Sequence, residues 1–166
     1  MRKDPAQAER KAGMVRTGGG FQPESSADRK DLPMVFTEGE LAYLRSQRLG
    51  RLATLAADGT LQNNPVGFSV DQDAGVINVG GRDLGNTRKF RNVAANGQVA
   101  FVVDDIASVD PWVVRCFEVR GSAEALTGQT PASPYMSAEI IRIHPRRIIS
   151  WGMGTDGSES SKRTVR

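Results

Sequence analysis

Apolar residues fall in short runs separated by turn signals from residue 36 to residue 151, a spacing typical of strands. Asp58-Gly59, between the first two runs, is a type I′ hairpin signal. The runs interpreted as strands are Leu49–Ala57, Leu61–Val70, Val76–Val79, Gln98–Asp104, Phe117–Leu126, Glu139–Ile143 and Arg147–Trp151. Short strands at this spacing predict a mainly β fold whose antiparallel sheet closes on itself as a barrel or a sandwich.

A short helix is expected to precede the first strand, from Glu38 to about Gln47. It begins with a capping box, in which Thr37 is the N-cap and Glu40 is the third helical residue. The apolar residues spaced to face the core are Leu41, Leu44 and Leu49.

A second helix is expected between the strands that end at Val79 and begin at Gln98. Asn86 is a favourable N-cap, and Asn96-Gly97 stops the helix. The buried stripe predicted for this helix consists of Phe90, Val93 and Ala94.

The two ends of the chain show no apolar periodicity and mix charges with Gly, Ser and Pro. Such segments bury too little apolar surface to offset the entropy lost on ordering. We therefore expect a disordered N-terminal tail over residues 1–34, one folded domain over residues 35–152 and a disordered C-terminal tail over residues 153–166.

The net positive charge of the chain comes from its two ends. There are 22 basic and 19 acidic residues, a net charge of +3. Residues 35–151 contain equal numbers of basic and acidic side chains, so the excess lies in the two tails. A neutral domain lacks the broad basic surface that a nucleic-acid backbone requires, and we expect no nucleic-acid partner.

Composition also excludes several kinds of site. Cys116 and His144 are the only residues of their types, which excludes an intrachain disulfide and a Cys- or His-rich metal site within one subunit. No apolar run approaches the ~18 residues that span a membrane. The N-terminus lacks the apolar core of a secretory signal. We expect a cytoplasmic protein with no metal and no membrane contact.

The segment from Val79 to Asn92 carries the strongest functional signal. It holds four basic residues and one acidic residue within a neutral domain, and its glycine-rich loop leads into a helix N-terminus. Free N–H groups and the helix dipole favour an anion there. Arg88 and Lys89 supply charges suited to phosphate. The alternative is a solvated basic helix face without a ligand.

The order and spacing of several short motifs resemble those of the pyridoxamine 5′-phosphate oxidase-like superfamily. Within it, the chain resembles the actinobacterial flavin/deazaflavin oxidoreductases that use coenzyme F420. The resemblance covers about Met34 to Gly152. The motifs that carry it include Leu49-Gly50-Arg51-Leu52-Ala53-Thr54, Asp58-Gly59-Thr60, Asn64-Pro65-Val66-Gly67-Phe68 and Asn86-Thr87-Arg88-Lys89-Phe90-Arg91-Asn92-Val93.

This resemblance implies a split β-barrel homodimer that binds its cofactor in grooves at the subunit interface. Thr87, Arg88 and Lys89 match the turn that holds the phosphate in FMN-binding members. In deazaflavin-binding relatives, the lysine position and nearby bases serve the acidic cofactor tail. Asn92 belongs to the same motif.

The resemblance also implies positions for the cofactor ring. Asn64–Phe68, which includes Gly67, matches the strand along the ring, where Pro65 and Val66 would pack on the ring and backbone groups would orient it. Gly80 and Gly81 would allow close backbone approach. Trp112, in an Asp-Pro-Trp loop, is a candidate to line the cofactor or substrate groove.

The implied function is a reductase that transfers a hydride from reduced F420 to an activated double bond of a small organic molecule. Aromatic polyketides such as tetracyclines are one candidate substrate class. No catalytic side chain is assigned, because the cofactor carries the hydride. The alternatives are an FMN-binding flavoprotein of this superfamily and a non-catalytic flavin or deazaflavin carrier.

Overall fold

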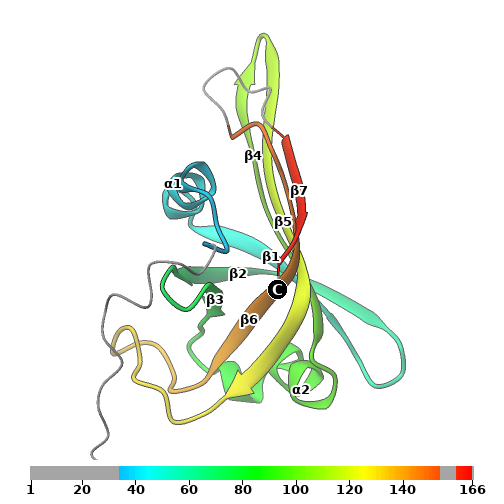
Figure 1. Ribbon diagram of the computed structural model, residues 1–166. Coiled ribbons are helices and arrows are strands. Elements are labelled where there is room, and N and C mark those ends of the chain that lie inside the picture. The colour runs from blue at the N-terminus through cyan, green and yellow to red at the C-terminus, as the bar shows by residue number, and fades with distance from the viewer. Residues whose placement is uncertain (1–33, 154–159, 166) are drawn as a thin grey trace, which may run out of the picture. The chain divides into compact units, whose positions relative to one another are not determined.

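A computed structural model describes residues 34–153 and 160–165, so the expected N-terminal tail lies outside the described residues apart from Met34. Figure 1 shows a curved antiparallel sheet flanked by two short helices. In chain order the elements are α1 (Glu38–Ser46), β1 (Leu49–Leu55), β2 (Leu61–Asp71), β3 (Val76–Val79), the 3₁₀ turn η1 (Leu84–Asn86), α2 (Arg88–Ala95), β4 (Gln98–Val109), β5 (Trp112–Leu126), β6 (Ile140–Trp151) and β7 (Ser160–Thr164).

The sheet closes into a barrel. Its strand order is β3-β2-β1-β4-β5-β6-β7, and β3 also pairs with β6. Residues 141–143 of β6 pair with β3, whereas residues 147–151 pair with β7. The first half of β6 therefore closes the barrel by pairing with β3. Its second half extends out of the barrel and pairs with β7. This split barrel confirms the predicted mainly β class.

The barrel interior holds the apolar faces of strands β1 to β6. In β5 the predicted alternation is confirmed, because Phe117, Val119 and Ala123 are buried. The largest fully buried side chains include Phe101, Phe117, Leu52, Ile77, Ile141, Ile143 and Ile148. Period-2 alternation on a closed sheet therefore fixes which side chains face outward, where a ligand can reach them.

Strand β6 is continuous, whereas the sequence predicts two separate strands, Glu139–Ile143 and Arg147–Trp151. Gly121 pairs with Pro145, and the next pair is Arg120 with Arg147. Arg146 is the extra residue of a β-bulge, which accommodates a proline in the middle of a strand.

The first helix starts as predicted. Thr37 and Glu40 form the capping box, and Leu44 is buried. Leu49, expected on the inner face of this helix, instead begins β1 and is 58% exposed.

The second helix starts one residue later than predicted. Its N-cap is Thr87, because the Thr87 side chain accepts the Phe90 N–H, whereas Asn86 ends η1 and bonds the Asp83 side chain. Ala94, expected in its buried stripe, is exposed.

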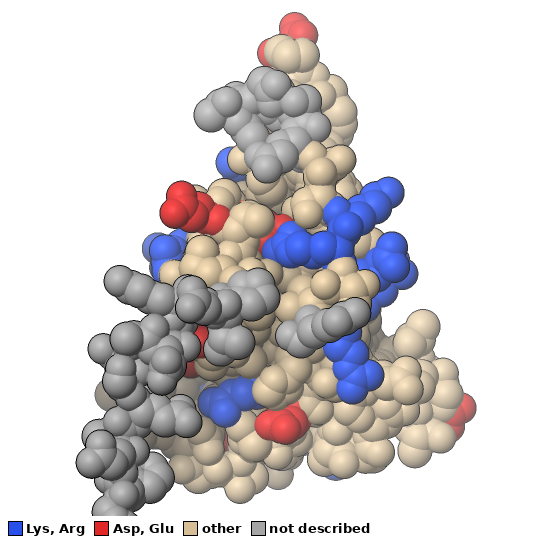
Figure 2. All heavy atoms as spheres, in the orientation of Figure 1, with Lys and Arg blue, Asp and Glu red and all other residues tan. Residues whose placement is uncertain are grey.

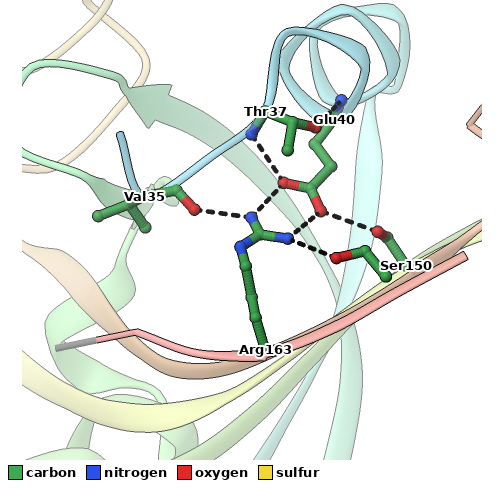
Figure 3. A network of polar contacts seen from close by, with 6 residues as sticks. Val35, Thr37, Glu40, Ser150 and Arg163 are labelled. Atoms are coloured by element: carbon green, nitrogen blue, oxygen red, sulfur yellow. Dashed lines mark hydrogen bonds and ion pairs between the residues drawn. The ribbon is translucent and has the colours of Figure 1, made fainter. Parts of the chain in front are cut away.

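The C-terminal segment contradicts the expected disordered tail over residues 153–166. Residues 160–164 form β7 and pair with β6, while residues 154–159 and 166 lie outside the described residues. The strand is held by Arg163, whose guanidinium reaches the carboxylate of Glu40 on α1 (Figure 3).

Glu40 is 1% exposed, and all its acceptor positions are used. Its Oε1 accepts from Arg163 Nη1 and Ser150 Oγ, both at 2.8 Å. Its Oε2 accepts from Arg163 Nη2 at 2.5 Å and from the Thr37 N–H at 2.9 Å. Arg163 Nη2 also donates to the Val35 carbonyl at 2.7 Å. One ion pair therefore joins α1 to both C-terminal strands (Figure 3).

Burial alone would raise the pKa of Glu40, but the hydrogen bonds from Arg163, Thr37 and Ser150 outweigh it and hold that pKa below its usual value of 4.5. A lowered folded-state pKa means that the carboxylate stabilises the fold fully above the pKa of the unfolded chain. That contribution is lost as the pH falls below about 4.5, through the lower folded-state pKa.

Arg163→Met should lower the free energy of unfolding by about 3–5 kcal/mol, because it leaves a buried carboxylate without its cation. Urea unfolding at pH 7 measures the difference. Lys162→Met, an exposed neighbour on β7, is the matched control and should change stability by less than about 0.5 kcal/mol. Equal stability of wild type and Arg163→Met would contradict the role given to the pair.

Candidate functional site

The turn that begins α2 is anchored to the barrel core through Thr87 and Leu84. Thr87 Oγ1 accepts the Phe90 N–H at 3.3 Å and donates to the Leu84 carbonyl at 2.7 Å. Leu84 is 2% exposed and belongs to the core cluster. The helix N-terminus therefore occupies a fixed position at the surface.

No carboxylate of residues 34–153 and 160–165 forms an ion pair with a cation of this turn, although hydrogen bonding with Thr60 and, to a smaller extent, the charge of Arg88 lower the pKa of the Asp58 carboxyl. Arg88 is exposed, Lys89 is half-buried, and the first turn of α2 holds no acidic residue. Arg91 donates to the Asn86 carbonyl at 2.7 Å. Free N–H groups, the helix dipole and two available cations fit a phosphate, which is the anion predicted from the sequence.

Asn92 takes a different role from the one expected. It is 6% exposed, and its amide nitrogen donates to Thr54 Oγ1 at 3.0 Å and to Gln62 Oε1 at 3.4 Å. The amide nitrogen thus ties α2 to β1 and β2, which positions the basic turn.

The predicted ring-binding residues alternate between the two faces of β2. Pro65 is exposed, Asn64 is half-buried, and Val66 is 6% exposed within the core. Val66 therefore cannot pack on a ring beside Pro65, because neighbouring strand residues point to opposite faces. A Cβ at Gly67 would meet no atom within 4 Å, so a ligand can approach the backbone there.

Gly80 and Gly81 follow β3 and lie close to side chains of neighbouring segments. A Cβ on Gly80 would lie 3.0 Å from Met136 Cε, and one on Gly81 would lie 3.4 Å from Leu84 Cβ. The Gly81 carbonyl accepts the Ser137 N–H at 2.9 Å. The glycines thus allow the loop after β3 to pack tightly against residues 136–137.

A cavity of about 820 Å³ lies between the end of α1, strand β2 and the segment that precedes β6. Gly67 and Gly80 line it, whereas Thr87, Arg88, Lys89 and Trp112 do not. Its polar residues, none of which belongs to a motif recognised in the sequence, include Arg45, Arg48, Ser69, Asn78, Glu139 and Arg142. Its apolar lining includes Leu44, Phe68, Val70, Met136 and Ile140.

The floor of this cavity is a row of polar residues across three strands. Ser69 pairs with Asn78, and Asn78 pairs with Arg142. Arg142 Nε donates to Asn78 Oδ1 at 3.2 Å. Each of these residues occupies an ordinary outward-facing position in its own strand, and nothing in the neighbouring sequence marks it. Only the strand register shows that they lie side by side.

Trp112 lies on the β4–β5 hairpin, which extends away from the barrel (Figure 1). Its side chain is 65% exposed. Within one chain, Trp112 therefore lies away from the cavity. It could line a groove only if that groove belonged to a second molecule.

Cys116 is buried on β5, and desolvation raises the pKa of its thiol to about 11. The thiol is therefore protonated at neutral pH and is not an activated nucleophile. The described residues contain no group of three or more His, Cys, Asp or Glu side chains placed to hold a metal ion. None of the described helices is long and apolar enough to cross a membrane.

Basic side chains form separate groups on the face in Figure 2, with acidic side chains among them. The largest group in this view lies over the strands in the middle. Charge on this face is therefore local, which suits small anionic ligands better than a continuous polyanion.

Comparison with known proteins agrees with the fold and the motif order. A family model described as pyridoxamine 5′-phosphate oxidase matches residues 36–163. A 5a,11a-dehydrotetracycline/5a,11a-dehydrooxytetracycline reductase from Streptomyces rimosus is 52% identical over 124 residues, which is 74% of this chain and 87% of the reductase.

Two solved structures share the fold. A conserved hypothetical protein from Mycobacterium tuberculosis has a TM-score of 0.55 at 22% identity, over 71% of this chain and 86% of that protein. A heme binding protein from Mycobacterium smegmatis has a TM-score of 0.56 at 16% identity, over 78% of this chain and 58% of that protein. With the match over residues 36–163, the chain belongs to the pyridoxamine 5′-phosphate oxidase family.

Proposed function

We propose that this protein is a reductase that uses reduced coenzyme F420 to saturate an activated carbon–carbon double bond of a polycyclic polyketide. The observation that carries the proposal is its 52% identity to a dehydrotetracycline reductase. The basic turn at α2 and the open backbone at Gly67 support a phosphate-bearing cofactor with a flat ring.

The cofactor phosphate and acidic tail are assigned to Thr87, Arg88 and Lys89, and the ring to the outer face of β2 at Pro65 and Gly67. When bound, reduced F420 would supply a hydride to the electron-poor carbon of the double bond and would itself be oxidised, while the neighbouring carbon would take a proton from solvent. The residues of the chain bind and orient the two molecules, since hydride transfer requires the reacting atoms to be held close together.

Titration of the purified protein with F420 and with FMN, followed by turnover of a dehydrotetracycline with reduced F420, tests the proposal. We expect tight F420 binding and reduction of the substrate double bond. Tight FMN binding without F420 binding would favour the flavoprotein alternative. F420 binding without turnover of a broad panel of activated alkenes would favour the carrier alternative.

Lys89→Ala and Arg88→Ala should each weaken F420 binding by about 1–3 kcal/mol, the range for a charge-assisted hydrogen bond. Cofactor fluorescence measures the dissociation constants. Lys162→Ala removes one positive charge from β7 and should leave the affinity unchanged. Wild-type affinity in both α2 variants would remove the phosphate-site assignment.

We also propose that the protein acts as a homodimer, with the β4–β5 hairpin in the interface. Ile106, Val109 and Trp112 are 54%, 75% and 65% exposed on this hairpin. Large apolar side chains gathered on one projecting element are typical of a surface that another protein covers. In such a dimer, Trp112 of one subunit would be free to line the groove of the other.

Light scattering should give twice the chain mass of 17.9 kDa for the wild type. Val109→Asp should shift the protein toward the monomer, because it places a charge within an apolar interface. Leu61→Asp, which changes an equally exposed leucine at the start of β2, should not. A monomeric wild type, or a dimer that Val109→Asp leaves intact, would contradict this interface.

A further inference from the structure

The cavity beside β2 carries a positive charge that the described residues do not neutralise. Arg45, Arg48 and Arg142 line it, and Glu139 is its one acidic residue. No carboxylate within residues 34–153 and 160–165 forms an ion pair with any of the three arginines; Arg45 donates to Gln72 at 2.9 Å. A cavity with a net positive lining favours an anionic ligand.

Arg142 is the arginine that the fold positions most firmly. It lies at the β6 end of the polar row, in which Asn78 on β3 pairs with Ser69 on β2 and with Arg142 on β6; on its other side Arg142 pairs with Glu124 on β5, without a hydrogen bond or ion pair between their side chains. Its Nε is held by Asn78 Oδ1 at 3.2 Å. Within the described part of the chain, neither of its two terminal nitrogens has a hydrogen-bond acceptor. A fixed guanidinium with a free edge is suited to two oxygens presented as a fork.

The apolar part of the lining indicates what accompanies the anion. Phe68, Val70, Met136 and Ile140 also line the cavity, Phe68 and Val70 from the side of β2 that packs on the core. The volume of about 820 Å³ lies within the range of pockets that enclose drug-sized molecules. The ligand is therefore expected to be a sizeable ring system that carries an acidic group at one side.

The position of the cavity separates it from the phosphate end of the proposed cofactor site. Gly67, assigned to the ring, lines the cavity, whereas Thr87, Arg88 and Lys89 do not. A hydride acceptor must lie against the ring rather than against the phosphate. The cavity is therefore placed to receive the substrate.

We propose that this cavity is the substrate pocket and that Arg142 determines specificity by binding the two oxygens of an ionised 1,3-dicarbonyl on a polycyclic substrate. The inference rests on the proposed function. An acidic group could also come from the cofactor tail, so the experiment measures the two ligands separately.

Direct binding of tetracycline, which carries an acidic 1,3-dicarbonyl, to cofactor-free protein tests the pocket without turnover. Arg142→Met should weaken tetracycline binding about 10- to 100-fold and leave the F420 dissociation constant unchanged. Arg142→Lys, which keeps the charge but loses the fork, should fall between wild type and Arg142→Met. Lys162→Met, the charge-matched control on β7, should bind tetracycline as the wild type does.

Retained tetracycline affinity in Arg142→Met would overturn the inference, as would a loss confined to F420, which would assign the cavity to the cofactor tail. Thermal unfolding of each variant checks that it is folded, and an effect of the milder Arg142→Lys confirms a role in recognition. If F420 turnover fails while tetracycline binding still depends on Arg142, the proposed function is wrong and the pocket assignment stands.

Discussion

The buried ion pair between Glu40 and Arg163 is the interaction on which the arrangement around the barrel depends. Glu40 lies at the start of α1, and its carboxylate takes hydrogen bonds from the helix cap, from Ser150 on β6 and from Arg163 on β7. The last turn of the same helix supplies Arg45 to the cavity, and Arg48 follows just after the helix ends at Ser46. A pair that fixes α1 against β6 therefore also fixes one wall of the proposed substrate pocket, although it lies outside that pocket.

The rest of the site follows from the closed sheet. Because β3 pairs with both β2 and β6, the outward residues Ser69 and Asn78 of one hairpin align in one row with Arg142, which is distant in sequence. The inward residues beside them, such as Ile77 and Ile141, fill the barrel. Core and pocket floor are thus opposite faces of the same strands, and a register shift of one residue would exchange them.

Much of the fold was predictable because its signals are local. The alternation in Phe117–Leu126 and the capping box at Thr37 depend on neighbouring residues, and both are confirmed. The C-terminal strand was not predictable in this way, since Ser160–Thr164 is polar and is held by a partner 123 residues away in sequence. The floor of the pocket was not predictable from local sequence either, because Asn78 and Arg142 meet only through long-range strand pairing. At Val66, by contrast, the strand alternation was available from the sequence and rules out a contact with the ring.

The two basic regions therefore differ in what their charges can do. At α2, the exposed Arg88 stands at a helix N-terminus, where backbone N–H groups share the anion and no ring system is enclosed. In the cavity, the half-buried Arg142 is oriented by Asn78, and apolar side chains contribute to the lining of the same cavity. The first arrangement suits a phosphate on a mobile tail, whereas the second suits a rigid acid that must be held in one orientation. A reductase needs both, because hydride transfer succeeds only when the cofactor is retained and the acceptor carbon is aligned with it.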